Sequence, residues 1–403
     1  MSSYDYDAIV VGGGPSGATA ATDLARMGRR VLLLDRAGRI KPCGGAIPPR
    51  LNRDFDIPDD LMVAQATLAR MVAPSGATVD MPVGNGAVGM VDRDVFDEWL
   101  RARAALAGSE RATGTYQRID RDADGTARVV WRGERSVGEI SATARVVIGA
   151  DGARSAVARQ EIRGGDRMKC VFAYHEVVRV PEDAGDFDRH RCDVIYQGKY
   201  SPDFYAWVFP HGDTASIGLG SANKGFPLRE TTRALRAESG LDRFETIRCE
   251  GAPIPLKPLK RWDNGRDVVV AGDAAGVVAP ASGEGIYYAM TAGRIAADAA
   301  DVFLATGKAS ALRAARKNFM RAHGRVFLIL GIMQYFWYSS DKRRERFVAM
   351  CADPDVQRLT WDAYMNKELV RADPMAHVRI FFKDLGHLFG IGKVAPPGTV
   401  PAE

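Results

Sequence analysis

Residues 6–35, YDAIVVGGGPSGATAATDLARMGRRVLLLD, decide the fold of the first part of the chain. An apolar run leads into three glycines, a stretch with helical spacing follows, and a second apolar run ends at Asp35. Strand, turn, helix and strand within about thirty residues form a βαβ unit. We therefore predict an α/β fold that begins with a Rossmann-like unit.

The glycine-rich turn of this unit, residues 12–17 (GGGPSG), fits the pattern GxGxxG. The first glycine permits the tight turn, the second lets the backbone approach a pyrophosphate, and the third lets the helix pack close to the strand. Amides at the helix N-terminus face the phosphates. Asp35, at the end of the next strand, is placed to bond ribose hydroxyls. The unit therefore predicts a dinucleotide-binding site.

Size, charge and cysteine usage limit the class of protein. At 403 residues, the chain is long enough for two or three packed units. Its 55 Lys and Arg residues and 50 Asp and Glu residues are scattered, so we predict no nucleic-acid partner. Its five cysteines are widely spaced without a CxxC pair, so we predict neither a disulfide framework nor a metal site. We also expect no signal peptide and a cytoplasmic location.

The remaining chain predicts three further regions. Residues 115–150 indicate a meander that turns at Asp124-Gly125 and returns to the first sheet, and residues 91–107 a helix capped by Asp92. Residues 168–262 favour an antiparallel sheet, and residues 310–390 are helical. We predict a dinucleotide-binding domain at 1–70, 91–165 and 266–305, a substrate domain at 71–90 and 166–265, and a C-terminal helical region at 306–403.

Two more motifs place an acid after a glycine at the end of an apolar run. They are GADGARSAV at residues 149–157 and AGDAAG at residues 271–276, with PASGEGIYYAM downstream. A carboxylate in that position can accept a hydrogen bond from a sugar hydroxyl, or it can cap a turn. Either motif alone leaves both interpretations open.

Together, the three motifs resemble the flavoprotein hydroxylase superfamily typified by p-hydroxybenzoate hydroxylase. The resemblance implies a Rossmann-like FAD-binding domain, an antiparallel-sheet substrate domain and a C-terminal helical region. It also implies that FAD is bound by Gly12, Gly14, Ser16, Gly17, Asp35, Arg36, Gly44, Arg93, Asp151, Gly272, Asp273, Gly283, Gly285 and Ile286. Only one GxGxxG is present, so the resemblance implies that NADPH docks transiently instead of occupying a Rossmann domain of its own.

Within that superfamily the chain is similar to the geranylgeranyl reductases. The similarity lies in Pro42-Cys43-Gly44-Gly45, in FYAWVFPHG at 204–212 and in GDAAGVVAPASGEGIYYAM at 272–290. It implies an FAD-dependent reductase that uses NADPH to saturate the isolated double bonds of a geranylgeranyl group. The branch that it resembles acts on bacteriochlorophyll or chlorophyll and yields the phytyl form. Reduction of geranylgeranyl lipids or of the diphosphate is the nearest alternative.

The segment FYAWVFP predicts a strand with one wholly aromatic face. Tyr205, Trp207 and Phe209 alternate with Phe204, Ala206 and Val208. An aromatic face suits an isoprenoid chain, which offers only apolar surface, so these three residues are candidate substrate-binding residues. Ordinary packing in the core of a sheet explains the same pattern, and the sequence leaves both interpretations open.

An isolated alkene requires a proton donor. It has no carbonyl to hold negative charge, so hydride delivery to one carbon must be coupled to protonation of the other. A lone cysteine is most often a small buried hydrophobe, but Gly44 and Gly45 would expose the thiol of Cys43. We predict Cys43 as the catalytic donor or as a group that positions the tail, with Tyr205 as the second candidate.

A stretch near the C-terminus predicts membrane contact. Residues 326–347, VFLILGIMQYFWYSSDKRRERF, are apolar and aromatic before they become basic, with Lys342, Arg343, Arg344 and Arg346. This is typical of a helix at the interface of an anionic membrane, or of a buried helix. Residues 377–392, HVRIFFKDLGHLFGIG, repeat the pattern. We predict peripheral association with the inner or photosynthetic membrane, without a spanning segment, and an isoprenoid-tailed pigment or lipid as substrate.

Two other functions remain open from the sequence. The first is an FAD-dependent monooxygenase of an aromatic or isoprenoid substrate on the same fold. The second is a flavin-bearing assembly or membrane-binding factor without turnover. A halogenase is disfavoured because the chain lacks the WxWxIP signature that we associate with that class.

Overall fold

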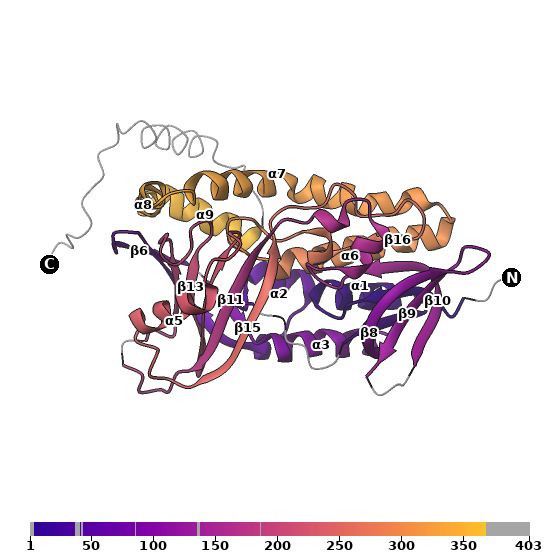
Figure 1. Ribbon diagram of the computed structural model, residues 1–403, viewed down its shortest axis with the longest axis horizontal. Coiled ribbons are helices and arrows are strands. Elements are labelled where there is room, and N and C mark those ends of the chain that lie inside the picture. The colour runs from indigo at the N-terminus through magenta and orange to yellow at the C-terminus, as the bar shows by residue number, and fades with distance from the viewer. Residues whose placement is uncertain are drawn as a thin grey trace. The chain divides into compact units, whose positions relative to one another are not determined.

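The computed structural model describes residues 4–36, 41, 43–84, 86–134, 138–185 and 187–367 (Figure 1). The chain divides into two compact units, and each is built from three separate segments. The first unit comprises Met1–Lys41, Arg93–Val171 and Pro253–Gly331, and the second comprises Pro42–Asp92, Phe172–Ala252 and Ile332–Glu403. The predicted α/β class is confirmed, since helices alternate with strands in the first unit.

The first unit is built on a six-stranded sheet in the order β1-β2-β8-β9-β10-β16, with β1 also paired to β10. Its strands are β1 (Tyr6–Val11), β2 (Val31–Asp35), β8 (Glu110–Arg121), β9 (Ala127–Gly133), β10 (Glu139–Gly149) and β16 (Val268–Val270). Strand β1 runs parallel to β2 and β10, whereas β9 is antiparallel to both of its neighbours. The predicted meander is therefore β8-β9-β10.

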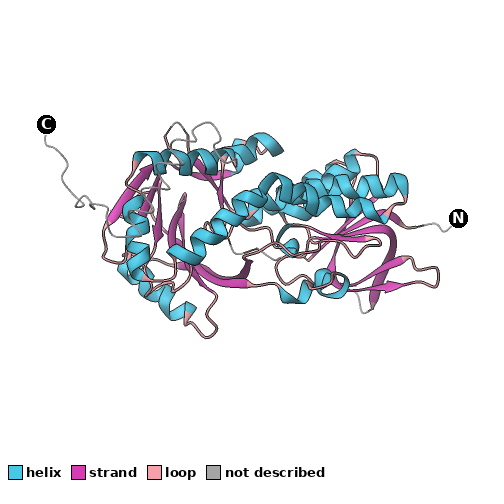
Figure 2. Ribbon diagram, turned by 90° about the horizontal axis from the view of Figure 1, so that it is seen from above, coloured by secondary structure: helices cyan, strands magenta, loops and turns pink. Residues whose placement is uncertain are grey.

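Helices cover this sheet (Figure 2). They are α1 (Pro15–Arg26), α3 (Arg93–Leu106), α4 (Ala156–Glu161), α6 (Ile286–Thr306) and α7 (Arg313–Trp337), with 3-10 turns η2 (Gly165–Arg167), η3 (Gly272–Ala275) and η4 (Ala309–Leu312). Helices α1 and α6 pack closely because small residues face one another. A Cβ on Gly293 of α6 would lie 2.1 Å from the carbonyl oxygen of Ser16.

The second unit holds a seven-stranded sheet in the order β15-β11-β14-β13-β12-β5-β6 and a three-stranded sheet β3-β7-β4. The large sheet contains β5 (Leu68–Val72), β6 (Thr78–Pro82), β11 (Cys170–Arg179), β12 (Arg191–Ile195), β13 (Ala206–His211), β14 (Thr214–Ser221) and β15 (Thr246–Pro255). The small sheet contains β3 (Ala46–Ile47), β4 (Met62–Ala66) and β7 (Val88–Val91). The helical elements are α2 (Pro49–Phe55), η1 (Asp59–Leu61), α5 (Leu228–Glu238), α8 (Asp341–Met350) and α9 (Pro354–Asn366).

The predicted domain boundaries differ from these units at several places, among them residues 42–70, 253–265 and 306–331. Residues 42–70 were predicted with the first domain but belong to the second unit, because β5 adds to the large sheet beside β12. Strands β5 and β12 run parallel, so the prediction of an antiparallel sheet is wrong for this pair. Residues 306–331 belong to the first unit, not to a separate helical region. Phe319 of α7 packs there against Trp262, with ring centroids 5.3 Å apart.

Across the residues that the structure describes, no helix has both the length and the apolar character needed to cross a bilayer. Residues 377–392, the second predicted interfacial segment, lie outside the described residues, and so does Pro42.

Candidate active site

The glycine-rich turn joins β1 to α1. Gly12 adopts φ +105°, and a Cβ there would lie 2.3 Å from the carbonyl oxygen of Ala150. A Cβ on Gly17 would lie 1.8 Å from the carbonyl oxygen of Gly12. Beside Gly14, by contrast, a Cβ would meet nothing within 4 Å. The first and third glycines of the motif are therefore required by packing, whereas the second borders open space.

The N-terminus of α1 has polar groups that suit a phosphate. No side chain caps the helix, and Pro15 occupies its first turn. The hydroxyl oxygen of Ser16 is buried and has no hydrogen-bond partner among the described residues. Buried polar groups are normally paired, so an orphan hydroxyl at a helix N-terminus fits a bound anion. These residues fit the pyrophosphate of FAD.

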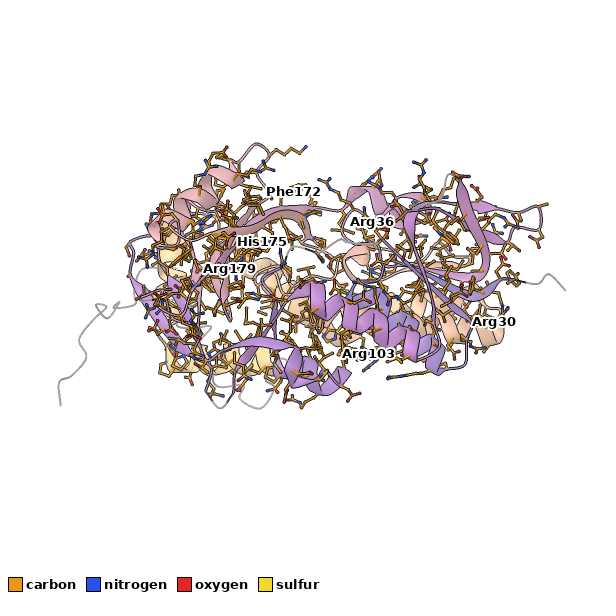
Figure 3. All side chains as sticks on the ribbon, turned by 90° about the horizontal axis from the view of Figure 1, so that it is seen from below. Arg30, Arg36, Arg103, Phe172, His175 and Arg179 are labelled. Carbon is orange, nitrogen blue, oxygen red and sulfur yellow. The ribbon has the colours of Figure 1, made fainter. Side chains whose placement is uncertain are left out.

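Asp35, the predicted ribose ligand, ends β2 and pairs with Arg101, which was not predicted as a site residue. The guanidinium of Arg101 on α3 lies 3.2 Å from a carboxylate oxygen of Asp35 and 3.4 Å from the carbonyl oxygen of Gly13. It also bonds Glu98. A ribose that bonds Asp35 would therefore share this carboxylate with Arg101. Arg36, the next residue, is exposed. It is labelled in Figure 3.

Two residues that were predicted to bind the cofactor form hydrogen bonds with residues close to them in the sequence. Arg93 is buried and donates two hydrogen bonds, of 2.9 and 2.8 Å, to Asp97. The carboxylate of Asp151 accepts hydrogen bonds from the Ser155 hydroxyl and from backbone N–H groups at the start of α4. Burial raises the pKa of Asp151, and these hydrogen bonds oppose the rise. The turn cap is therefore present at Asp151, and the contact of Asp151 with the cofactor stays a prediction.

The third motif, which begins at residues 271–276, lies beside α1. A Cβ on Gly272 would lie 2.6 Å from Cβ of Ser16. The carboxylate of Asp273, in η3, is buried and forms an ion pair with Lys41. A Cβ on Gly285 would lie 3.9 Å from the Oδ1 atom of Asp273. Gly283, Gly285 and Ile286 lead directly into α6, so this motif and the glycine-rich turn form one region of the first unit.

The loop around Cys43 is anchored in the second unit. The backbone N–H of Gly45 donates to the Cys43 sulfur at 3.4 Å. A Cβ on Gly44 would lie 2.9 Å from the Phe209 ring, and a Cβ on Gly45 would lie 2.5 Å from the carbonyl oxygen of Val91. The two glycines therefore let the loop pack on β13 and β7, and Cys43 is left half-buried.

A histidine and an aspartate support this loop. The Nε2 atom of His211 lies 3.0 Å from the carbonyl oxygen of Gly44, and its Nδ1 atom lies 3.2 Å from a carboxylate oxygen of Asp92. His211 lowers the pKa of Asp92, against the opposing effect of burial. Asp92 was predicted only as a helix cap; its carboxylate faces His211.

The aromatic face predicted for residues 204–210 is formed by Tyr205, Trp207 and Phe209, although β13 begins only at Ala206 and Phe204 is not part of the strand. The ring centroids of Tyr205 and Trp207 are 6.0 Å apart, and those of Trp207 and Phe209 are 6.3 Å apart. Ala206 and Val208 point into the opposite core cluster. The Trp207 indole N–H donates to the Ser216 hydroxyl at 3.1 Å. We call Tyr205, Trp207 and Phe209 the aromatic row.

Tyr205 lies where this row meets a larger aromatic cluster and Cys43. Its ring stacks on Phe204 at 4.3 Å and lies 6.1 Å from Tyr196. Burial raises the pKa of Tyr205 well above its ordinary value, and Tyr338 and Cys43 add to the rise. The phenol therefore holds its proton firmly. Both predicted catalytic residues and the predicted substrate-binding row are thus neighbours in one unit.

The predicted site residues therefore form two groups. Cys43, Gly44, Tyr205, Trp207 and Phe209 belong to the second unit, and the other predicted residues belong to the first. The cofactor contact of Gly44 stays a prediction. Four supporting residues were missed: Lys41, Asp92, Arg101 and His211. Only Lys41 had a usable signal, since it directly precedes the PCGG motif.

Comparisons with known proteins agree with this geometry. A family model described as FAD dependent oxidoreductase matches residues 7–56. The chain is 59% identical over 386 residues to the geranylgeranyl diphosphate reductase of Rhodobacter capsulatus, which covers 96% of this chain and 98% of that protein. It is 32% identical over 331 residues to the digeranylgeranylglycerophospholipid reductase of Methanoculleus marisnigri, which covers 76% of this chain and 79% of that protein.

A solved structure shares the fold. The geranylgeranyl bacteriochlorophyll reductase-like protein from Thermoplasma acidophilum aligns with a TM-score of 0.78 at 22% identity, and the alignment covers 92% of this chain and 99% of that chain. The predicted fold, a Rossmann-like FAD-binding part with a substrate-domain sheet and C-terminal helices, is therefore confirmed.

Proposed function

Because the chain belongs to the geranylgeranyl reductase family of FAD-dependent oxidoreductases, we propose that it uses NADPH to reduce the geranylgeranyl tail of bacteriochlorophyll or chlorophyll to phytyl. It is an FAD-dependent reductase of C=C bonds. The use of NADPH as reductant and the identity of the pigment head group are the parts that we propose. The pigment rests on the general similarity of the segment around Cys43 and of the C-terminal helices, and the diphosphate and the phospholipid named for the relatives are the alternatives.

One observation carries the proposal: Gly44 packs on Phe209, and the neighbouring Cys43 is close enough to Tyr205 to raise the pKa of that phenol, so the thiol lies beside the aromatic row. An acid beside an aromatic surface is the arrangement that reduction of an isoprenoid alkene needs. When bound, FAD supplies the two-electron chemistry, accepting a hydride from NADPH and delivering it to one alkene carbon. The other carbon takes a proton from the protein, so each reduction consumes one NADPH and one proton.

Cys43 fits the role of proton donor better than Tyr205 does. The Gly45 N–H bonds the sulfur, and such a bond grows stronger as the thiol loses its proton and becomes a thiolate. The thiol proton passes to carbon, and water restores it. Tyr205 holds its proton more firmly because burial raises its pKa. It is therefore the second candidate, and its ring also borders the tail.

The aromatic row is proposed to hold the tail. Tyr205 and Trp207 are buried and Phe209 is half-buried, so Phe209 is the member of the row most open to a tail. Contact with apolar surface contributes about 25 cal/mol per Å² buried and has no direction. The tail can therefore shift along the row, as successive reductions of the same chain require.

A direct assay tests the function. Purified FAD-loaded protein is incubated anaerobically with NADPH and a geranylgeranylated pigment, and the products are resolved by mass spectrometry. Dihydro, tetrahydro and phytyl products are expected. Flavin that NADPH bleaches while the alkenes survive would contradict the proposal. Parallel reactions with geranylgeranyl diphosphate and with a geranylgeranyl phospholipid decide the head group, and substrate-dependent oxygen uptake would favour the monooxygenase.

A cysteine substitution tests the proton donor. Cys43→Ala is expected to retain FAD and to be reduced by NADPH, while alkene reduction slows by about a hundredfold or more. Cys249→Ala is the matched control, because Cys249 is an exposed thiol in the same unit. Unchanged turnover in Cys43→Ala would remove Cys43 from the mechanism and leave Tyr205 to be tested by Tyr205→Phe.

A further inference from the structure

Six of the nine residues that line a cavity of about 700 Å³ in the first unit are cations. Asp263 is the one carboxylate among its lining residues. The cations, which we call the basic basin, are Lys260, Arg261, Arg313, Arg316, Lys317 and Arg321. Within the described part of the chain, none of these six side chains forms an ion pair. Six cations beside one carboxylate leave a net positive charge, which is suited to an external polyanion.

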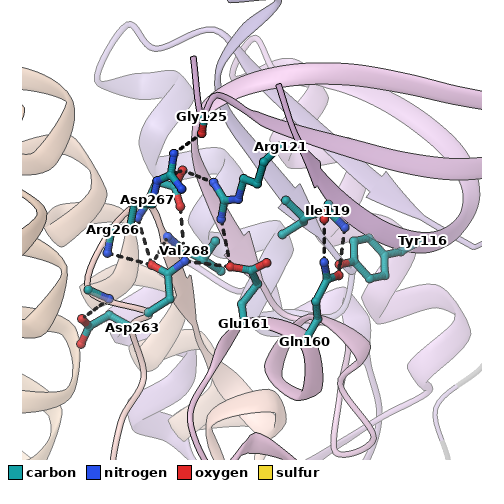
Figure 4. Close-up of polar contacts among 12 residues, drawn as sticks. Tyr116, Ile119, Arg121, Gly125, Gln160, Glu161, Asp263, Arg266, Asp267 and Val268 are labelled. Carbon is teal, nitrogen blue, oxygen red and sulfur yellow. Dashed lines mark hydrogen bonds and ion pairs between the residues drawn. The ribbon is translucent and has the colours of Figure 1, made fainter. Parts of the chain in front are cut away.

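One wall of the basin is a rigid turn at residues 263–267. The side-chain oxygen of Asn264 accepts hydrogen bonds from the backbone N–H groups of residues 266–268. Its amide group donates to Glu161 at 2.8 Å. Figure 4 shows Arg121 bonded to both Glu161 and Asp267 behind the turn. The turn is therefore fixed before any ligand arrives.

The other wall is α7, which is tied to the chain before the turn. Trp262 is fully buried against Phe319 of α7. The Nε atom of Arg316 donates to the carbonyl oxygen of Leu259 at 2.9 Å. The cations of α7 are thus held at fixed positions relative to those of the turn, so the basin is a built feature of the unit.

The exposed face of α7 continues from the basin. Lys317, Arg321 and Arg325 are followed, at spacings of three or four residues, by Leu328, Ile332 and Tyr335. Such spacing places all six on one side of a helix. Leu328, Ile332 and Tyr335 are 65%, 60% and 86% exposed. This face is therefore basic in its first half and apolar or aromatic in its second.

We propose that the basic basin and this face of α7 bind the surface of an anionic phospholipid membrane. Lipid phosphates would occupy the basin, and Leu328, Ile332 and Tyr335 would enter the boundary between head groups and acyl chains. A nucleotide phosphate explains the face less well. The basin lining contains no aromatic ring for a base to stack on, and the apolar residues beyond it would have no role.

The proposal does not depend on the reductase reaction, since binding is measured without substrate. FAD-loaded protein is sedimented with vesicles of phosphatidylcholine alone or with a minor fraction of phosphatidylglycerol. We expect binding to the anionic vesicles that weakens with salt. Lys317→Glu/Arg321→Glu should weaken it at least about tenfold. Leu328→Ser/Ile332→Ser should weaken it while the remaining binding keeps its salt dependence.

Matched controls exist on the first unit, which holds the basic basin. Arg167 is 85% exposed in its side chain and Leu106 is 89% exposed, so Arg167→Glu and Leu106→Ser remove similar groups elsewhere. Both should bind vesicles like the unaltered protein, and all variants should keep its melting temperature. Equal binding to neutral and anionic vesicles, or unchanged binding of both double variants, would overturn the proposal. So would a raised KM for NADPH in Lys317→Glu/Arg321→Glu with unchanged vesicle binding, because the basin would then serve the nucleotide.

Discussion

The Nε2 atom of His211 lies 3.0 Å from the carbonyl oxygen of Gly44, and this contact fixes the Cys43 loop to β13. The other ring nitrogen faces Asp92 at 3.2 Å. His211 therefore lies between the Gly44 carbonyl and the carboxylate of Asp92 and links the Cys43 loop to the end of β7.

We predict that His211→Phe slows alkene reduction without loss of FAD. The substitution leaves the Gly44 carbonyl and Asp92 without their partner, which costs about 1–3 kcal/mol and loosens the loop that positions Cys43. Steady-state kcat and the flavin absorbance of the purified protein are measured. His211→Gln, whose amide can still donate to Gly44, should recover part of kcat. Equal loss in both variants would show that His211 does not act through this hydrogen bond.

The pairing of Asp92 with His211 predicts a pH dependence of stability. Because His211 lowers the pKa of Asp92 below its ordinary value of 3.8, folding favours the ionised carboxylate. The resulting stability is fully present above that ordinary value and is lost as pH falls through the lower folded value. The melting temperatures of the unaltered protein and of Asp92→Asn should therefore converge as pH falls below about 4.

An exposed carboxylate of the same unit, in Asp60→Asn, controls for the loss of one negative charge. A difference between the unaltered protein and Asp92→Asn that stays constant over the acid range would contradict the inferred pairing.

Gly45 is predicted to tolerate no side chain. It adopts φ +70°, and a Cβ there would lie 2.5 Å from both the Val91 carbonyl oxygen and the His211 ring. Gly76, in the same unit, has φ +89° but would meet nothing within 4 Å. Both alanine substitutions incur backbone strain of about 1–3 kcal/mol, and only Gly45→Ala adds a clash. Gly45→Ala should therefore melt at a lower temperature than Gly76→Ala. Equal melting temperatures would show that the loop around Gly45 moves enough to accommodate a methyl group.

The parts of the fold that could be predicted depend on local patterns. The βαβ unit and the turn at Asp124-Gly125 follow from glycine placement and apolar spacing over a few residues. The pairing of β5 with β12 does not, because it joins residues 68–72 to residues 191–195. Because β5 pairs with β12, residues 42–70 belong to the second unit, although they were predicted to belong to the first domain.

The same distinction holds for the site. The glycine-rich turn and the aromatic row are local, and both could be predicted. The contacts of Asp92 with His211 and of Arg101 with Asp35 join residues far apart in the sequence, with no spacing that links them. Asp151 shows the converse. Its motif allowed a sugar contact or a turn cap, and only the structure shows the cap.

The buried hydroxyl of Ser16 yields a prediction that separates cofactor binding from folding. Its oxygen has no partner among the described residues, so Ser16→Ala removes an unsatisfied polar atom and should leave the FAD-free protein as stable as before or more stable. FAD affinity should fall by about tenfold, since a hydrogen bond to a charged phosphate is lost. Thermal melting of the FAD-free protein and fluorescence titration with FAD measure the two effects.

Thr22→Ala is the matched control for Ser16→Ala. The Thr22 hydroxyl is buried in the same helix but already donates to the Ala18 carbonyl oxygen at 2.7 Å. Its removal should lower stability slightly and leave FAD affinity unchanged. If Ser16→Ala instead destabilised the FAD-free protein and bound FAD normally, the hydroxyl would have a structural partner in solution. Only the backbone of α1 and the open space beside Gly14 would then support a phosphate site here.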